Sequence, residues 1–200
     1  FPEKRLADLE QGTARAVAEL GFDSLADGAR HLLSGEPTGR QLDVLAGHLT
    51  IGETYFFRDA GTFRALAEDI LPRLIHARRG RHPRLRLWSA GCSSGEEAYS
   101  LAILVHRTLP DLRDWDVTIL GTDINPAGLE KARAGVYGAW SFRGVPLAIK
   151  THYFAPAGDG RYALKEDIRK LVTFARVNLA DDTYPSPHTM DIVLCRNVLM

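Results

Sequence analysis

The stretch at residues 88–97, WSAGCSSGEE, decides how we expect this chain to fold. An apolar run at residues 85–90 predicts a strand that ends in this stretch, and residues 96–109 predict a helix that begins in it. Gly91 and Gly95 allow the backbone of the intervening turn to come close to a ligand. In doubly wound sheets, nucleotides bind outside the carboxyl ends of the strands, so this turn is a candidate binding site.

The alternation of strand and helix continues downstream. Residues 117–122 predict a second strand, and residues 126–134 predict a helix that Asn125 caps. Apolar runs at residues 172–177 and 191–195 predict two more strands. Strands that alternate with helices predict an α/β fold built on a parallel sheet.

One segment interrupts this alternation. Between residues 137 and 167, the sequence YFAPAGDGRYAL places a turn rich in proline and glycine between two aromatic ends. This pattern predicts a small antiparallel β insertion, at about residues 150–165, inside the α/β domain.

The N-terminal part of the chain has a different pattern. Its apolar residues recur at intervals of three and four, which predicts an all-α domain with a first break at Gly21. A further helix is predicted at residues 60–78, before RGRHPR, a stretch with the composition of a linker. We therefore expect a helical N-terminal domain with its linker over residues 1–80 and the α/β domain over residues 81–200.

Composition argues against several classes of protein. The chain is 45% apolar and has 25 Lys and Arg residues against 25 Asp and Glu residues, so no net charge draws it to nucleic acid. No apolar run approaches the roughly 18 residues of a membrane span, and the first residues lack the pattern of a signal peptide. Cys92 and Cys195 lack the spacing of a zinc site and are too few for a disulfide framework. We expect a cytoplasmic protein without nucleic acid, metal or membrane insertion.

Charge is nevertheless uneven along the chain. Six arginines lie between Arg73 and Arg86, with no carboxylate among them. This basic run is either a solvated linker or a surface that contacts an acidic partner. Added salt would weaken the contact with a partner.

The acidic end of the glycine-rich stretch bears on the kind of ligand. A phosphate-binding loop has a lysine after its last glycine, whereas Glu96 follows Gly95 here and would repel a phosphate. A cationic or phosphate-free ligand suits this loop, and S-adenosylmethionine, which carries a sulfonium group, fits that description. The alternative is that Glu96 and Glu97 only complement the dipole at the N-terminus of a helix.

Polar residues follow the other predicted strands. Asp123 ends the second strand, where an acidic side chain accepts hydrogen bonds from ribose hydroxyls; the alternative is a turn or cap residue. Asn178 with Leu179, and Asn197 beside Arg196, follow the later strands, where an amide is able to read an adenine edge. Asparagine at a strand end is usually a turn residue, so the convergence of these residues at one edge carries the prediction.

The segment LTIGETYFFRD, residues 49–59, belongs to the helical half. Its adjacent phenylalanines exceed what one amphipathic face buries, so we expect the segment to pack between the two halves. Thr54 and Arg58 are four residues apart and would share one helical face. Arg58 would then bind a carboxylate of the cofactor or the substrate, or form a structural salt bridge.

Together these segments resemble the CheR family of chemotaxis protein methyltransferases, in order and in spacing. The motifs that carry the resemblance are LTIGETYFFRD, LWSAGCSSGEEAYSLA, ILGTDIN, LEKARAGVY, VTFARVNL and DIVLCRNVLM. The resemblance implies a Rossmann-like methyltransferase domain with a small antiparallel β insertion, preceded by an all-α N-terminal domain. It also implies methyl transfer from S-adenosylmethionine to glutamate side chains on the cytoplasmic methylation helices of chemoreceptors, with S-adenosylhomocysteine as the product.

The resemblance also implies which residues form the site. Carried over position by position, the cofactor contacts of the family fall on Thr54, Arg58, Glu96, Asp123, Asn178, Leu179, Arg196 and Asn197. Arg58 is in addition the residue that we expect to act in catalysis, by orienting the substrate carboxylate or the cofactor.

Three features depart from the family. Gly52 stands where relatives often have asparagine, the hairpin turn at residues 155–160 is short, and the chain ends at Met200, where relatives continue. We therefore expect a looser site near Gly52, a β insertion that does not bind a receptor tail, and an incomplete Rossmann-like domain.

Other functions stay open at this point. A methyltransferase for a small molecule or for nucleic acid would use the same fold, although the neutral net charge argues against nucleic acid. A dehydrogenase is disfavoured because the loop lacks GxGxxG. A non-catalytic module would bind S-adenosylmethionine or S-adenosylhomocysteine and signal through the helical domain, and turnover with a receptor fragment would distinguish it from an enzyme.

Overall fold

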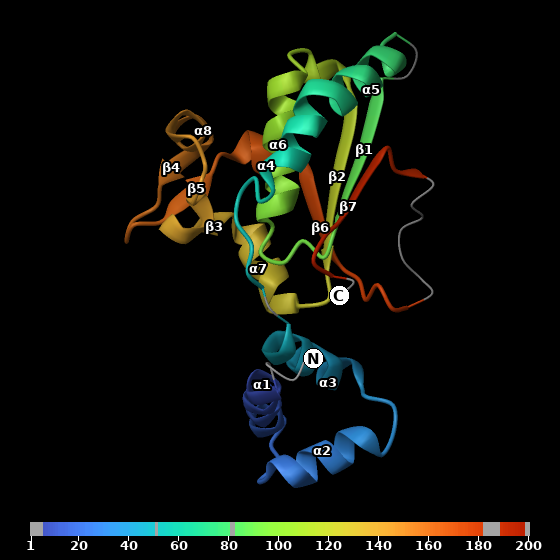
Figure 1. Ribbon diagram of the computed structural model, residues 1–200, viewed down its shortest axis with the longest axis vertical. Coiled ribbons are helices and arrows are strands. Elements are labelled where there is room, and N and C mark those ends of the chain that lie inside the picture. Colours follow the sequence, from blue (N-terminus) through green and yellow to red (C-terminus); the bar gives the residue numbers. More distant parts are fainter. Residues whose placement is uncertain (1–5, 51, 81–82, 182–188, 199–200) are drawn as a thin grey trace.

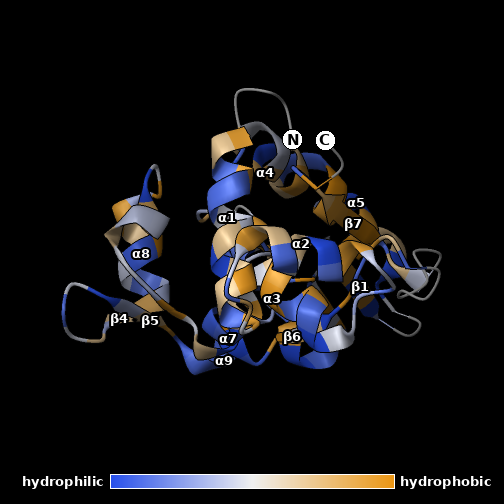
Figure 2. Cartoon of the chain, turned by 90° about the horizontal axis from the view of Figure 1, so that it is seen from below, coloured by the Kyte–Doolittle hydropathy of each residue, from blue (hydrophilic) through white to orange (hydrophobic). Residues whose placement is uncertain are grey.

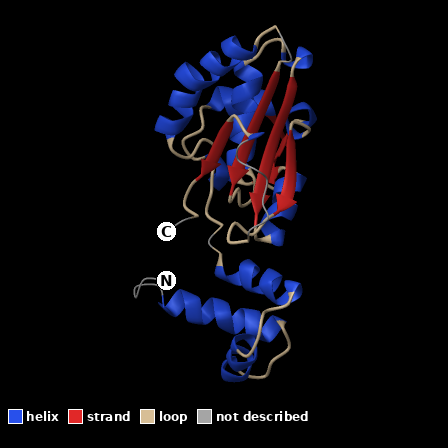
Figure 3. Cartoon of the chain, turned by 90° about the vertical axis from the view of Figure 1, so that its right-hand side faces the viewer, coloured by secondary structure: helices blue, strands red, loops and turns tan. Residues whose placement is uncertain are grey.

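The central layer of the molecule is a four-stranded parallel sheet (Figure 1). The computed structural model describes residues 6–50, 52–80, 83–181 and 189–198. The strands, in the spatial order β6-β2-β1-β7, are β1 (Arg84–Ala90), β2 (Asp116–Asp123), β6 (Val172–Arg176) and β7 (Ile192–Cys195). Their carboxyl ends all point toward the N-terminal helices (Figure 3). The predicted Rossmann-like α/β fold is confirmed.

Two helices connect the first three strands and lie side by side on the sheet. They are α6 (Glu96–Thr108) and α7 (Pro126–Ala134), and a single turn of 3-10 helix, η3 (Leu112–Asp114), precedes β2. Residues 96–105 of α6 are all buried, because the helix lies between the sheet and other elements. The Tyr99 hydroxyl donates to the Ala132 carbonyl at 2.8 Å, which joins α6 to α7. Asn125 caps α7 as predicted, since its side chain accepts from the amides of Ala127 and Gly128.

The helix at residues 60–78 shares the core of the sheet. It runs through α4 (Ala60–Ala65), a π-helical turn η2 (Leu66–Ile70) and α5 (Leu71–Arg78). Its apolar side chains, Phe63, Leu66, Leu71 and Ile75, belong to the same buried cluster as Leu85 and Leu87 of β1. An amphipathic pattern does not reveal which neighbour covers the apolar face, and the domain boundary expected at residue 80 stays a prediction.

Three helices form a separate bundle at the carboxyl ends of the strands. They are α1 (Leu6–Glu19), α2 (Leu25–Leu33) and α3 (Gly39–Leu49), and α1 packs on both others. Viewed from below, the bundle overlies α7 and the end of β6 (Figure 2). Asn125 donates to the Thr50 hydroxyl at 2.9 Å, and Arg176 pairs with Asp43 at 2.5 Å. The bundle is therefore tied to the ends of β2 and β6.

A second, three-stranded antiparallel sheet projects to one side of the molecule (Figure 1). It contains β3 (Val136–Tyr137), β4 (Phe154–Pro156) and β5 (Tyr162–Leu164), in the order β3-β5-β4. Three short helices accompany it: η4 (Ala139–Phe142), α8 (Leu147–Tyr153) and α9 (Glu166–Arg169). The predicted hairpin is β4 and β5. Strand β3 was not predicted, because two residues are too few to show an alternating pattern.

The basic run at residues 73–86 pairs with aspartates. Arg78 bonds to Asp191, Arg79 to Asp111 at 3.0 Å, and Arg86 to Asp116 at 2.5 Å; Arg73 lies 3.5 Å from Asp69. Arg73 and Arg78 lie in α5, and Arg84 and Arg86 lie in β1, so these four arginines belong to a helix and a strand and not to a linker. The contact with an acidic partner stays a prediction. Of the helices that the structure describes, none is long and apolar enough to cross a membrane.

Candidate functional site

The carboxyl ends of the parallel strands form one edge of the sheet. Ala90, the last residue of β1, lies beside Thr122 of β2 and Cys195 of β7, and Asp123 lies beside Arg176 of β6. The residues that follow these strands therefore start from a common edge. The predicted site residues at this edge are Glu96, Asp123, Asn178, Leu179, Arg196 and Asn197.

The glycine-rich loop after β1 uses its backbone N–H groups within the protein. The amides of Gly91 and Cys92 both donate to the Thr122 carbonyl, at 2.7 and 2.8 Å. The Ser93 amide donates to the Asp123 carboxylate at 2.7 Å, and the Gly95 amide donates to the Cys92 carbonyl at 2.9 Å. A phosphate cradle needs such amides to point at the ligand. These four amides do not point at a ligand, which favours a phosphate-free ligand, in agreement with the acidic residues that follow the loop.

The two glycines of the loop are required by protein packing. Both have positive φ, +75° at Gly91 and +91° at Gly95. A Cβ atom at Gly95 would lie 2.7 Å from the Cβ of Ala132 on α7, and one at Gly91 would lie 2.2 Å from the Val198 side chain. From the sequence we attributed these glycines to the approach of a ligand, whereas the described atoms that crowd them belong to α7, to Phe174 of β6 and to Val198, which follows β7.

Glu96 is a buried acceptor at the first turn of α6. The residue is only 3% exposed. Each of its two carboxylate oxygens accepts one hydroxyl, from Ser141 at 2.9 Å and from Ser94 at 2.7 Å. Burial raises the pKa of this carboxyl, while the two serine hydroxyls and the charge of Arg143 oppose that rise. An ionised carboxylate has about four acceptor positions, so the two serine hydroxyls do not fill the acceptor capacity of Glu96.

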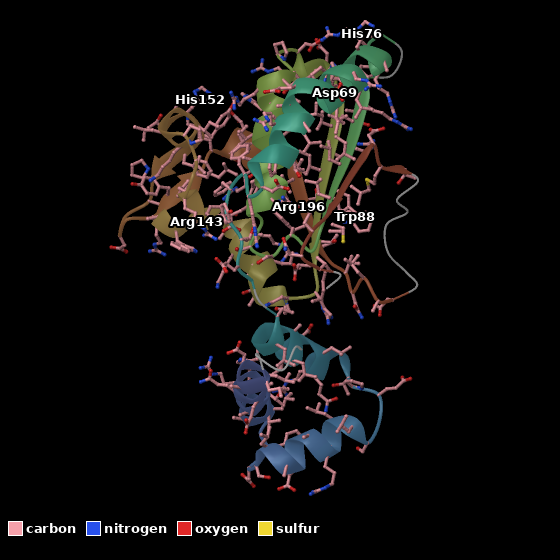
Figure 4. The ribbon with its side chains drawn as sticks, viewed as in Figure 1. Asp69, His76, Trp88, Arg143, His152 and Arg196 are labelled. Atoms are coloured by element: carbon pink, nitrogen blue, oxygen red, sulfur yellow. The ribbon has the colours of Figure 1, made fainter. Side chains whose placement is uncertain are left out.

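Glu97, which the sequence analysis left out of the site, forms a buried ion pair with Arg196. The Arg196 guanidinium donates to the Glu97 carboxylate at 2.7 Å, and a second nitrogen donates to the Arg58 carbonyl, also at 2.7 Å. Ser89 donates to the other oxygen of Glu97 at 2.7 Å. Arg196 lies where β7, α6 and the start of α4 meet (Figure 4). Its side chain therefore joins parts of the protein, a role that the order of residues in the sequence does not reveal.

Asp123 organises the loop from the end of β2. One carboxylate oxygen accepts the Ser93 amide, and the other accepts the Asn125 amide at 2.9 Å. One bond comes from the loop after β1 and the other from the residue that caps α7, so the carboxylate is fixed at the edge of the sheet. As for Glu96, about half of its acceptor positions remain for ligand hydroxyls.

The segment at residues 52–59 is a loop, so the helical face predicted for Thr54 and Arg58 is wrong. Phe57 and Asp59 have positive φ, +56° and +67°, which no α-helix contains. The Gly52 carbonyl accepts the Ser93 hydroxyl at 3.1 Å, so the segment crosses the glycine-rich loop. Arg58 folds back and donates to a backbone carbonyl of its own loop, that of Glu53, at 2.6 Å.

Phe56 anchors this loop. It is 1% exposed and packs against Tyr137, Phe142 and Phe154, with ring centroids 4.9 to 5.3 Å apart. The Phe57 amide donates to the Ser100 hydroxyl of α6 at 2.9 Å. The segment was expected to pack between the two halves of the chain: Phe56 packs against the β insertion, and Phe57 packs edge-on against Phe63 of α4, with ring centroids 5.2 Å apart.

The amides after the later strands take part in turns. The Asn178 side chain accepts from the Ala180 amide at 3.1 Å and donates to Asp181 at 2.8 Å. Leu179 beside it is half-buried, and Asn197 is exposed with φ of +57°. The Asn178 amide makes one donor and one acceptor bond within the turn and so retains hydrogen-bonding capacity.

Comparison with known proteins agrees with this geometry. A family profile described as "CheR methyltransferase, SAM binding domain" matches residues 52–200. The chain is 35% identical to chemotaxis protein methyltransferase 2 of Vibrio cholerae, over 82% of this chain and 57% of that protein. It is 32% identical to a chemotaxis protein methyltransferase of Borreliella burgdorferi, over 99% of this chain and 70% of the relative. It is 37% identical to chemotaxis protein methyltransferase 1 of Pseudomonas aeruginosa, over 93% of this chain and 68% of the relative.

Proposed function

The chain belongs to the CheR methyltransferase family, and we propose that it transfers a methyl group from S-adenosylmethionine to glutamate side chains of chemotaxis-type receptors. The products are glutamyl methyl esters and S-adenosylhomocysteine. The relatives that carry the name chemotaxis protein methyltransferase support this proposal. The chain spans 57% of the Vibrio relative and 70% of the Borreliella relative, so the activity of the whole protein is part of the proposal.

One observation carries the proposal: two carboxylates flank a loop in which the amides of Gly91, Cys92, Ser93 and Gly95 are bonded within the protein. Glu96 and Asp123 would accept from the hydroxyl and ammonium groups of the cofactor. Asn178 and Asn197 would bind the adenine edge, and Leu179 would pack against the ring. Thr54 and Arg58 would close the site from the loop at residues 52–59. Because the Arg196 side chain is already paired with Glu97, we expect Arg196 to contact the cofactor through its backbone.

The chemistry needs few catalytic groups. When bound, S-adenosylmethionine supplies an electrophilic methyl group. A glutamate carboxylate is itself a competent nucleophile near neutral pH, so the chain has to orient it and exclude water, and no general base is required. Arg58 is the cation that we assign to orienting a carboxylate, of the substrate or of the cofactor.

The proposed partners are the methylation helices of chemoreceptors. Because these helices are cytoplasmic, we place the protein in the cytoplasm. The hairpin turn of the β insertion is only a few residues long, between β4 and β5, so we do not assign a receptor tail to it.

Binding of S-adenosylhomocysteine by calorimetry tests the cofactor assignment. We expect one-site binding to the wild type and a loss of roughly tenfold or more in Asp123→Ala, because hydrogen bonds to a charged acceptor are lost. Asp116→Ala is the matched control, since Asp116 lies on the same strand, β2, but at its amino end, where it pairs with Arg86. Equal affinities for Asp123→Ala and the wild type would remove Asp123 from the site.

Turnover tests the reaction itself. A fragment of a receptor that contains its methylation helices is incubated with methyl-labelled S-adenosylmethionine, and the label is then released by base as methanol, because carboxyl methyl esters hydrolyse readily. Base-labile label that depends on receptor glutamates is the expected result. Cofactor binding without such label would favour the non-catalytic module.

A further inference from the structure

Ser141 stands where three separate parts of the chain meet. It lies in η4, at the base of the β insertion, and is half-buried. Its hydroxyl donates to the Glu96 carboxylate at 2.9 Å, and its backbone carbonyl accepts the Phe56 amide at 3.0 Å. One residue therefore connects the insertion to the first turn of α6 and to the loop that carries Arg58.

A second contact joins the same parts. The hydroxyl of Tyr137, in strand β3, donates to the Ser94 carbonyl at 2.9 Å, and the Ser94 hydroxyl donates to the other oxygen of Glu96. Tyr137 is 4% exposed and packs edge-on against Phe56 at 4.9 Å. Both oxygens of Glu96 thus depend on residues that the insertion holds in place, Ser141 directly and Ser94 through Tyr137.

We infer that Ser141 is a positioning residue that fixes the Glu96 carboxylate for cofactor binding, and that the β insertion thereby forms part of the cofactor site. The inference rests on the proposed function, since it takes the ligand to be S-adenosylmethionine or its product. It adds a residue, and a structural element, that sequence motifs at the strand ends do not include.

The groups around Glu96 predict the direction in which its pKa changes when the Ser141 hydroxyl is removed. Arg143 lies in the turn after η4 and stabilises the ionised carboxylate, whereas Tyr137 and the Cys92 thiol are neutral groups whose pKa values burial raises. The Ser141 hydroxyl lowers the pKa of Glu96, against the larger effect of burial. Without this hydroxyl, Glu96 would hold its proton to higher pH and would lose acceptor capacity toward the ligand.

Ser141→Ala is the variant that tests this role. We measure S-adenosylhomocysteine affinity by calorimetry between about pH 5 and 8, where a raised carboxyl pKa is felt. Affinity of the variant should fall roughly five- to tenfold, the effect of one hydrogen bond, and the acidic limb of its pH profile should move to higher pH. Ser141→Thr keeps the hydroxyl and should restore both the affinity and the profile.

Thr151→Ala is the matched control. Thr151 lies in α8 of the same insertion, is exposed, and donates only to backbone carbonyls of its own helix among the described atoms. It should bind like the wild type at every pH.

Each other result contradicts one part of the argument. Wild-type affinity and pH profile in Ser141→Ala would overturn the inference while the proposed function stands. A loss that is equal at every pH and is not restored by threonine would mean general loosening of the insertion, and would also overturn it. An absence of binding by the wild type would overturn the cofactor assignment, and the inference with it.

Discussion

Replacing Arg196 with glutamine should destabilise the fold more than it weakens cofactor binding. The Arg196 side chain is 20% exposed and the Glu97 side chain 10%, so the ion pair between them is largely removed from water. Glutamine keeps an amide near Glu97 but removes the charge and the bond to the Arg58 carbonyl. Glu97 would then remain buried, with the Ser89 hydroxyl as its remaining described partner.

The expected loss follows from the geometry of the pair. Removing one member of a fully buried pair costs about 3–5 kcal/mol, because the other charge stays without compensation. Since about a fifth of the arginine side chain reaches solvent, we expect a smaller loss of about 2–3 kcal/mol. In a chain of this size, that corresponds to a fall in the unfolding temperature of roughly 5–10 °C.

Urea unfolding, followed by tryptophan fluorescence, measures this loss in Arg196→Gln, in Glu97→Gln and in the double variant. The two single losses should add to more than the loss of the double variant, with a coupling energy of about 1–3 kcal/mol. S-adenosylhomocysteine affinity, measured beside it, should fall less than tenfold in Arg196→Gln. The matched control is Arg86→Gln, since Arg86 pairs with the exposed Asp116 near the amino ends of β1 and β2.

The opposite pattern would refute the argument. A loss of stability below about 0.5 kcal/mol, with cofactor affinity abolished, would mean that the Arg196 guanidinium acts on the ligand. In that case the carry-over of a family cofactor contact to the Arg196 side chain would be right, and the ion pair with Glu97 would contribute little to folding.

Three further predictions concern single sites. Because burial raises the pKa of Glu96 above its ordinary 4.5, the folded state holds that proton more tightly than the unfolded state, so stability falls as pH rises from about 4.5 through the raised value. Glu96→Gln should remove this dependence, as urea midpoints between about pH 5 and 8 would show. Gly95→Ala should cost about 2–5 kcal/mol by thermal unfolding, because the residue has positive φ and its new Cβ would meet Ala132 at 2.7 Å; an unchanged midpoint would contradict this. Arg58→Ala should lower methylation at least roughly tenfold while stability stays within about 0.5 kcal/mol, and undiminished turnover would remove its catalytic role.

The parts of the fold that the sequence predicts are those with a local cause. The pattern from β1 to α7 was readable because each strand is a short apolar run, glutamates open α6, and Asn125 caps α7. The positions of Asp123 and Glu96 at the edge of the sheet followed, since a residue after a parallel strand has only one edge to occupy. The sequence did not indicate what these side chains bond to, because Ser141 and Ser93 approach them from other segments.

No local sequence pattern determines the conformation of the loop at residues 52–59, so the helical face predicted there was wrong. Thr54 and Arg58 have helical spacing, yet Phe57 and Asp59 adopt left-handed conformations that cost free energy in any L-residue other than glycine. Tertiary contacts offset that cost: Phe56 is buried against the β insertion, and the Phe57 amide bonds to Ser100 of α6.

The same contacts decide where Arg58 lies. The Arg196 guanidinium, which follows β7, donates to the Arg58 carbonyl. Two residues earlier in the loop, the Phe56 amide donates to the Ser141 carbonyl. Both partners come from segments more than eighty residues downstream, so the shape of the loop depends on the sheet and the insertion. If Arg58 orients a carboxylate, as we propose, it gains from this arrangement, since packed elements fix the backbone from which its side chain extends.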